Sequence, residues 1–181
     1  PGQPYQSVEI VSKKDLFRNF LAENGFHVPR AHGFTTLEEA QKDWNNFTKP
    51  VMVKPVDSSG SKGVSKIEKL EELPHAMEYA LSFSRDKRVV IEEYVDASYI
   101  HAINGDGFSV DGKLVFSCFA GQYFSPKVEN PFTPVSSIWP HPMPKHLHHK
   151  VHDEFQRALT LLNMKTGVYN FEARVDKNEN V

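Results

Sequence analysis

The feature that most constrains this chain is a β-strand that runs directly into a loop of small residues. The stretch Val51–Val64 reads VMVKPVDSSGSKGV: three apolar residues, then Lys54, a proline, and a loop rich in serine and glycine. Main-chain N–H groups in such a loop can converge on anionic oxygens, and the lysine adds a point charge. The spacing matches neither GxxxxGK[ST] nor GxGxxG. The segment therefore predicts either a phosphate site or an ordinary hairpin turn, because turns use the same residues for their backbone freedom.

Composition narrows the class of protein. The chain has 181 residues, 39% of them hydrophobic and 24% charged, which suits one domain or two small lobes. The net charge of −2 gives no reason to expect nucleic acid or an anionic membrane as a partner. No apolar run approaches the ~20 residues of a membrane span, and no signal peptide is visible. The single cysteine, Cys118, excludes an internal disulfide and is expected to be a buried strand residue, so we expect a cytoplasmic protein.

Hydrophobic periodicity predicts helices mixed with β-hairpins. Ser12 is interpreted as the N-cap of a first helix and Gly25 as its C′ residue, and Thr35 or Thr36 caps a second helix. Helices mixed with hairpins indicate an α+β fold rather than a doubly wound parallel sheet. The remaining expectations are helices over 71–84 and 145–163, a long loop over 125–144, a hairpin turn at Asp111-Gly112, and strands over 51–54, 64–67, 89–95, 108–110, 114–120 and 166–175.

Four segments, in the correct order, resemble the ATP-grasp superfamily, in particular its carbamoyl-phosphate-synthase-like and glycinamide-ribonucleotide-synthetase-like members. VKPVDSSGSKGV resembles the phosphate loop and SKKDLFRNFLAENGFHVPR the opening helix of the grasp domain. VVIEEYV resembles the strand of the adenine hinge, and GVYNFEARVD the strand that carries the first magnesium carboxylate. The resemblance implies an ATP-grasp-like α+β fold in which two lobes clasp a nucleotide. It divides residues 1–181 into opening helices (about 1–50), a small nucleotide-binding lobe (about 51–95) and part of a larger lobe with the metal-site strand (about 96–181).

The resemblance also leads us to expect a truncated domain. The sequence stops at Val181 within DKNENV, which is typical of a turn between two strands. In the family, the next strand carries a second metal-binding glutamate and an asparagine, and another domain precedes the grasp module. We therefore expect a missing N-terminal domain and a C-terminal remainder of the same chain as partners, and a fragment that is inactive on its own.

Two lysines and the loop are the expected phosphate contacts. By resemblance, Lys54 contacts ATP phosphates, and so does Lys14, which matches the family position better than Lys13. The simpler alternative is that both helix lysines lie in a solvated first turn, although cations there oppose the helix dipole. The loop residues expected to bind the cofactor are Ser58, Ser59, Gly60, Ser61, Lys62 and Gly63.

The strand VVIEEYV is the expected adenine hinge. The resemblance places adenine at Glu92, Glu93 and Val95, held by main-chain groups and a nearby acid. The alternative is a charged edge strand, in which paired glutamates discourage aggregation. Many family members carry a ribose-binding glutamate a few residues further on, but this chain reads DASYIH there. The group that binds ribose stays open, with Asp96, Tyr99 and His101 as candidates.

The last strand predicts a metal site. Alternation places Asn170, Glu172 and Arg174 on one face, opposite Tyr169 and Phe171. A carboxylate oxygen beside an arginine is what a magnesium site needs, because the arginine can grip a phosphate or carboxylate. The alternative is a plain salt bridge between neighbouring strands. The resemblance assigns magnesium to Glu172 and makes Lys54 and Arg174 the expected catalytic residues.

Taken together, the resemblance implies an ATP- and magnesium-dependent ligase of the carboxylate–amine type. Such an enzyme transfers the γ-phosphoryl group of ATP to a small-molecule carboxylate, and an amine then attacks the acyl phosphate. Two other classes stay open. One is a regulatory or degenerate grasp module that binds nucleotide without turnover, and the other is an α+β interaction domain in which the Ser/Gly loop is only a hairpin.

Overall fold

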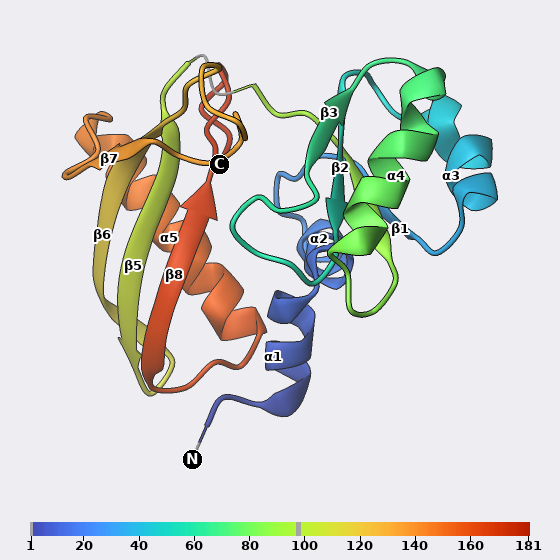
Figure 1. Ribbon diagram of the computed structural model, residues 1–181. Coiled ribbons are helices and arrows are strands. Elements are labelled where there is room, and N and C mark those ends of the chain that lie inside the picture. Colours follow the sequence, from blue (N-terminus) through green and yellow to red (C-terminus); the bar gives the residue numbers. More distant parts are fainter. Residues whose placement is uncertain (1, 97–98) are drawn as a thin grey trace. The chain divides into compact units, whose positions relative to one another are not determined.

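The computed structural model describes residues 2–96 and 99–181, which form two compact units, each with a four-stranded antiparallel sheet (Figure 1). We call Glu9–Tyr94 the first unit, and Val95–Val181 together with Pro1–Val8 the second unit. Helices and antiparallel strands are mixed in both, so the fold class is α+β, as the sequence predicted.

The sheet of the first unit has the strand order β1-β4-β2-β3. Helices α3 and α4 supply the core on one of its faces, and α2 packs against β1 and β4 on the other. The elements of this unit are α2 (Lys14–Glu23), β1 (Ala31–Phe34), α3 (Leu37–Asp43), the 3-10 turn η1 (Trp44–Asn46), β2 (Val51–Pro55), β3 (Ser65–Ile67), the 3-10 turn η2 (Leu70–Glu72), α4 (Leu73–Ser82) and β4 (Val89–Glu93).

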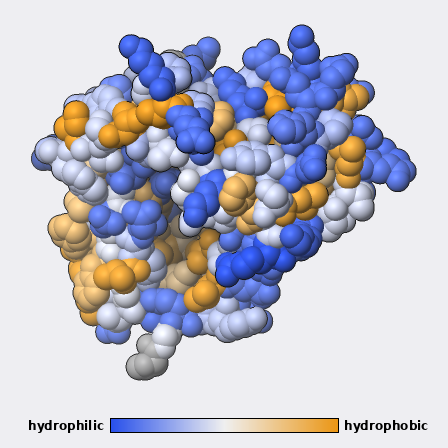
Figure 2. Space-filling view, viewed as in Figure 1, coloured by the Kyte–Doolittle hydropathy of each residue, from blue (hydrophilic) through white to orange (hydrophobic). Residues whose placement is uncertain are grey.

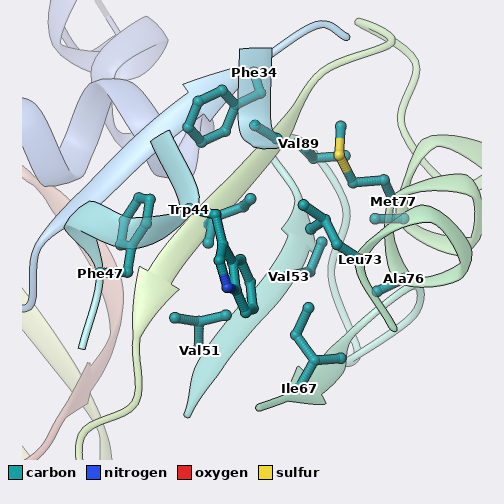
Figure 3. Close-up of a cluster of buried hydrophobic side chains, with 13 residues drawn as sticks. Phe34, Trp44, Phe47, Val51, Val53, Ile67, Leu73, Ala76, Met77 and Val89 are labelled. Carbon is teal, nitrogen blue, oxygen red and sulfur yellow. The ribbon is translucent and has the colours of Figure 1, made fainter. Parts of the chain in front are cut away.

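The core of the first unit forms because alternate strand residues point to the same face. Val51 and Val53 of β2 and Val89 and Ile91 of β4 are all fully buried and face α3 and α4 (Figure 3). Burial of each such side chain contributes ~1.5–3 kcal/mol. The remaining members of this cluster are Phe34, Ala40, Trp44, Phe47, Ile67, Leu73, Ala76, Met77 and Ala80.

The sheet of the second unit has the order β7-β6-β5-β8, and one long helix, α5, covers one of its faces (Figure 1). Phe155 of α5 stacks on Phe171 of β8, with ring centroids 4.0 Å apart, and on Phe119 of β6, at 6.0 Å. Among the described residues of this unit, no helix covers the other face of this sheet. The elements of the unit are β5 (Ala102–Val110), β6 (Lys113–Tyr123), β7 (Ser136–Ile138), α5 (Lys145–Leu161) and β8 (Gly167–Ala173), and the helix α1 (Tyr5–Ser12) begins in this unit and ends in the first unit.

Several local predictions are confirmed. Gly25 follows α2 with a φ of 70°, as a C′ residue should. Thr36 accepts a hydrogen bond from the Glu39 N–H, and the Glu39 carboxylate accepts one from the Thr36 N–H, which together form a capping box. The hairpin turn at Asp111-Gly112 joins β5 to β6 with positive φ at both residues, as a type I′ turn requires.

Other local predictions are wrong. Ser12 ends the helix α1 instead of capping the next one, and the residue before α2 is Lys13, which makes no side-chain cap. Residues 31–34 form β1, so the part of the chain interpreted as opening helices contributes a strand to the sheet. The proline-rich segment 125–144 contains the short strand β7. Cys118 lies on β6 as expected but is half-buried rather than buried.

Candidate functional site

Strand β2 carries Lys54 to the beginning of the Ser/Gly loop. β2 is hydrogen-bonded on both sides, by β3 and β4, so the position of Lys54 is fixed by the sheet. The hairpin that the sequence allowed is therefore present, and it is a long one. Gly60, Ser61 and Gly63 have φ values of 68°, 57° and 71°, so the loop turns through three left-handed residues. Ser59, Gly60 and Lys62 are exposed at its tip, whereas Ser58 and Ser61 are half-buried.

The start of this loop is fixed to the segment that follows α4, and its end packs against α4 itself. At its start, the Asp57 carboxylate accepts hydrogen bonds from Ser84 Oγ at 2.8 Å and from the N–H groups of Arg85 and Asp86 at 3.0 and 3.1 Å. Burial acts to raise the pKa of the Asp57 carboxyl, but these hydrogen bonds lower it overall. At the other end, Gly63 lies so close to α4 that a Cβ atom would come within 3.2 Å of the Ala80 Cα. The exposed tip of the loop thus lies between two ends whose positions are fixed.

The first turn of α2 also contacts the loop. The Lys14 N–H donates to Val56 O at 2.9 Å, and the Lys14 ammonium donates to Ser58 O. Lys13 instead pairs with Asp86 at 2.7 Å. Of the two neighbouring lysines, Lys14 is therefore the one that the structure brings to the loop.

A buried carboxylate joins Lys54 to α2. Glu92 of β4 is 5% exposed; its Oε1 contacts the Lys54 ammonium and its Oε2 accepts from Arg18 Nε at 3.0 Å. Burial alone would raise the pKa of the Glu92 carboxyl, but the charges and hydrogen bonds of Lys54 and Arg18 outweigh it and lower the pKa from 4.5 to about 2. Glu92 is ionised at neutral pH, and its side chain is occupied by two cations.

The expected hinge strand is not the edge strand that the alternative interpretation allowed. β4 lies inside the sheet, between β1 and β2, so the edge-strand alternative is wrong. The N–H of Glu93 donates to Arg30 O at 2.9 Å and that of Tyr94 to Pro50 O at 3.0 Å, so these two donors are already used. The Glu93 carboxylate accepts from the Thr48 N–H at 2.7 Å. Val95 is the first residue beyond this hydrogen-bonded stretch.

In the second unit, the uncovered face of the sheet carries a group of polar side chains. The alternation predicted for β8 is confirmed: Phe171 is buried, and Asn170 and Glu172 are exposed. On β5, Asn104 is paired with Glu172, and Asp106 with Asn170, so all four side chains share this face. Asn170 Nδ2 donates to Asp106 Oδ1 at 3.2 Å. Arg174 follows the end of β8 and is half-buried.

These groups suit a magnesium ion. Magnesium prefers carboxylate and amide oxygens, and the face offers both from Glu172 and its neighbours. Asn104 Oδ1 is fully buried and has no hydrogen-bond partner in the structure, an arrangement that costs ~1–3 kcal/mol unless a ligand or ion satisfies it. Among the residues that the structure describes, however, no group of three or more His, Cys, Asp or Glu side chains is positioned to hold a metal ion.

Sequence reasoning missed Arg18, Asn104 and Asp106. Arg18 lies one helical turn after Lys14, so the two share a face of α2, which is a usable signal. The strand alternation of β5 was hidden because two of its inward residues are glycines, Gly105 and Gly107. The candidates for ribose binding have other contacts: Tyr99 donates to Glu179 at 3.0 Å, and the His101 ring lies 4.1 Å from that of Tyr123.

A separate cavity of ≈440 Å³ lies between α5 and β6. Its polar lining includes His152, whose Nδ1 is 2.9 Å from Ser117 Oγ, while His148 Nε2 is 3.1 Å from His141 O. These partners account for the two histidines as contacts of α5 with β6 and with the segment before α5. Among residues 2–96 and 99–181, no helix has the length and hydrophobicity needed to cross a bilayer.

The fold is that of the ATP-grasp ligases. The chain belongs to the D-ala D-ala ligase C-terminus family, whose sequence model matches residues 21–178. It is 26% identical over 178 residues to the carbamoyl phosphate synthase large chain, C-terminal section, of Aquifex aeolicus, covering 98% of this chain and 32% of that protein. It therefore spans about a third of the length of this relative.

Two solved structures share the fold. The VanG D-Ala:D-Ser ligase of Enterococcus faecalis superposes with a TM-score of 0.80 at 20% identity, over 96% of this chain and 51% of that one. A biotin carboxylase of Campylobacter jejuni, solved as a complex with β-γ-ATP, gives a TM-score of 0.78 at 16% identity, over 98% and 40% of the two chains.

Proposed function

We propose that this chain is the nucleotide-binding part of an ATP- and magnesium-dependent ligase of the carboxylate–amine type. One observation carries the proposal: Lys54 is fixed at the end of β2, at the beginning of a loop whose ends are immobilised and whose tip is exposed. Family membership and the fold support it, since the relatives named above include ligases.

The phosphate groups of ATP would bind in the first unit. The N–H groups of the loop from Ser58 to Gly63, with Lys62 at its tip, would surround the phosphate oxygens. Lys54 and Lys14 would supply positive charge, which stabilises the charge that develops on a transferring phosphoryl group. Adenine would bind at the end of β4, where Val95 follows the hydrogen-bonded stretch and Glu92 and Glu93 support the strand.

Magnesium would bind in the second unit through Glu172, with Asn104 and Asp106 on the same face. The ion would supply charge neutralisation to the phosphate oxygens. Arg174, just beyond β8, would bind a phosphate or carboxylate oxygen. A substrate carboxylate would take the γ-phosphoryl group, with ADP as the leaving group, and the amine would then attack the acyl carbon and release phosphate.

A thermal-shift experiment tests the nucleotide site. The chain is heated with magnesium and adenylyl imidodiphosphate, beside Lys54→Ala and the matched control Lys42→Ala. Lys42 is an exposed lysine of α3 that pairs only with Glu38 among the contacts found here. A ligand at 100 times its Kd adds ~2.7 kcal/mol to stability, which is a readable shift. We expect the shift to persist in Lys42→Ala and to disappear in Lys54→Ala.

The alternatives give different results. Nucleotide binding without turnover would indicate the regulatory module, and we would then withdraw the ligase activity. Equal shifts in both lysine variants would contradict the phosphate role of Lys54. Because ATP is abundant in the cytoplasm and the single cysteine forms no disulfide within the chain, we expect the protein to work in that compartment.

A further inference from the structure

We propose that Arg18 is a positioning residue that allows Lys54 to leave Glu92 and bind a nucleotide phosphate. The inference rests on the proposed function, because it concerns how the phosphate lysine becomes available. Arg18 would act through Glu92 alone and would not touch the nucleotide.

Lys54 and Arg18 bind different oxygen atoms of the Glu92 carboxylate. Glu92 Oε1 contacts Lys54, and Glu92 Oε2 accepts from Arg18 Nε at 3.0 Å, so neither cation replaces the other. The side chain of Glu92 is 6% exposed, while those of Lys54 and Arg18 are 21% and 31% exposed. The carboxylate is thus out of water, and both cations reach it from the partly exposed side.

The arrangement matters when a phosphate arrives. If Lys54 were the sole partner of Glu92, its movement toward an anion would leave a buried carboxylate without compensation, which is strongly unfavourable. With Arg18 present, one charged partner remains when Lys54 turns away. The three groups carry a net charge of +1, so the cluster as a whole still attracts an anion.

Arg18 is not needed to hold α2 on the sheet. Asp15 of the same helix is 2% exposed and pairs with Arg88, and the Lys14 N–H donates to Val56 O at 2.9 Å. A Cβ atom at Gly33 of β1 would come within 2.6 Å of the Asp15 carboxylate, so the helix lies tightly against the strand. The position of α2 is therefore fixed independently, which leaves the Arg18–Glu92 pair open to a role in binding.

A double-mutant cycle tests the proposal. The Kd of magnesium adenylyl imidodiphosphate is measured by calorimetry for the whole chain, Arg18→Gln, Glu92→Gln, the double variant and Arg18→Lys. We expect Arg18→Gln to weaken binding about tenfold, within the range for residues of one ion-pair network. Glu92→Gln removes the competing carboxylate, so adding Arg18→Gln to it should leave the Kd unchanged. Arg18→Lys should restore most of the affinity.

Arg157→Gln serves as the matched control, because it makes the same change of residue and charge on α5, where Arg157 pairs with Glu154 at 3.2 Å. The loss in Arg18→Gln should persist at high salt, which screens long-range charge effects. If Arg18→Gln alone does not fold, a loss of affinity on adding Arg18→Gln to Glu92→Gln would still overturn the proposal.

Each other result has one meaning. A tenfold loss on adding Arg18→Gln to Glu92→Gln would mean that Arg18 contacts the nucleotide itself, and the proposal would be wrong. Unchanged affinity in Arg18→Gln, or an equal loss in Arg157→Gln, would also overturn it. If the unaltered chain binds no nucleotide, the proposed function fails for this chain and the inference falls with it.

Discussion

The two units organise their charged groups in opposite ways. In the first unit, Asp15 and Glu92 are buried and paired with arginine or lysine. In the second unit, Asp106 and Glu172 lie exposed on an uncovered sheet face, beside an asparagine oxygen that has no partner. Each buried carboxylate of the first unit has a cationic partner, although Asp15 Oδ1 itself accepts no hydrogen bond. In the second unit the polar groups of the sheet face have no cationic partner among the described residues, and Asn104 Oδ1 accepts no hydrogen bond.

The uncovered sheet face of the second unit is polar in one part and hydrophobic in another. Toward the β5–β6 turn, Phe108 is paired with Phe116 on one side and Val168 on the other, and these three side chains are 38%, 54% and 81% exposed. Figure 2 shows a hydrophobic area over the lower ends of these strands, next to a hydrophilic area higher up. Polar groups thus occupy one defined part of the face, and hydrophobic groups occupy another.

The largest expected effect is on the free energy of unfolding, where substitutions of Glu92 and Glu172 should differ most. Glu92→Gln removes a buried charge from its two cations and should lower the free energy of unfolding by ~3–5 kcal/mol. Glu172→Gln alters an exposed carboxylate and should change it by no more than ~0.5 kcal/mol. Urea unfolding at neutral pH gives both values.

Glu92→Leu tests whether the loss of stability comes from the missing negative charge. A nonpolar replacement of a buried ion-pair member still leaves Lys54 and Arg18 without their anion, so it should be as damaging as Glu92→Gln. A variant that is as stable as the unaltered chain would show that the cluster adds nothing to stability and that the contrast between the units is not energetic.

Acid should remove the same stabilisation. The pKa of Glu92 is lower in the folded state, so its contribution is complete above the unfolded pKa near 4.5 and is lost as the pH falls through about 2. The contribution is about 3 kcal/mol. The difference in unfolding free energy between the unaltered chain and Glu92→Gln should therefore shrink between pH 5 and pH 2.5. A difference that stays constant over this window would contradict the lowered pKa.

Replacing either of two glycines by alanine should lower stability, for a different reason in each case. A Cβ atom at Gly105 of β5 would come within 2.4 Å of Cys118 O and 2.6 Å of the Phe119 ring, so Gly105→Ala should cost ~1–3 kcal/mol by overpacking. At Gly60 nothing lies within 4 Å, but φ is +68°, so Gly60→Ala should cost only ~1 kcal/mol of backbone strain. Thermal unfolding ranks the two, and the reverse order would contradict the packing of Phe119 over Gly105.

Local signals in the sequence predicted the elements that depend on local chemistry. The capping box at Thr36, the C′ glycine at Gly25 and the hairpin at Asp111-Gly112 are each decided by a few neighbouring residues. The helix α1 and two strands were missed, the strands because their sequences carry no such signal. β1 is only four residues long and contains a glycine, and β7 lies within a proline-rich segment. Both are strands because the neighbouring strand supplies hydrogen bonds, which is a tertiary effect.

The candidate site was predicted in its parts but not in its connections. The sequence identified Lys14, Lys54 and Glu92 separately, and resemblance assigned them to phosphate and adenine. It did not show that Glu92 binds Lys54, because the two residues are 38 positions apart and meet only when β4 pairs with β2. Arg18 was missed for the same reason. Residue types are readable in a sequence, whereas the pairing of charges depends on strand order.

The smallest effect concerns the asparagine of the second unit. Asn104→Leu removes a buried oxygen that has no hydrogen-bond partner, so stability should stay level or rise by up to ~1 kcal/mol. If the oxygen serves a magnesium ion, the same variant should bind manganese more weakly in the presence of ADP, which electron paramagnetic resonance measures directly. Asn178→Leu, a change of the same kind at an exposed position in the unit, is the control. A loss of stability with unchanged manganese binding would mean that Asn104 supports the sheet, and the uncovered face would then owe its polar character to the fold.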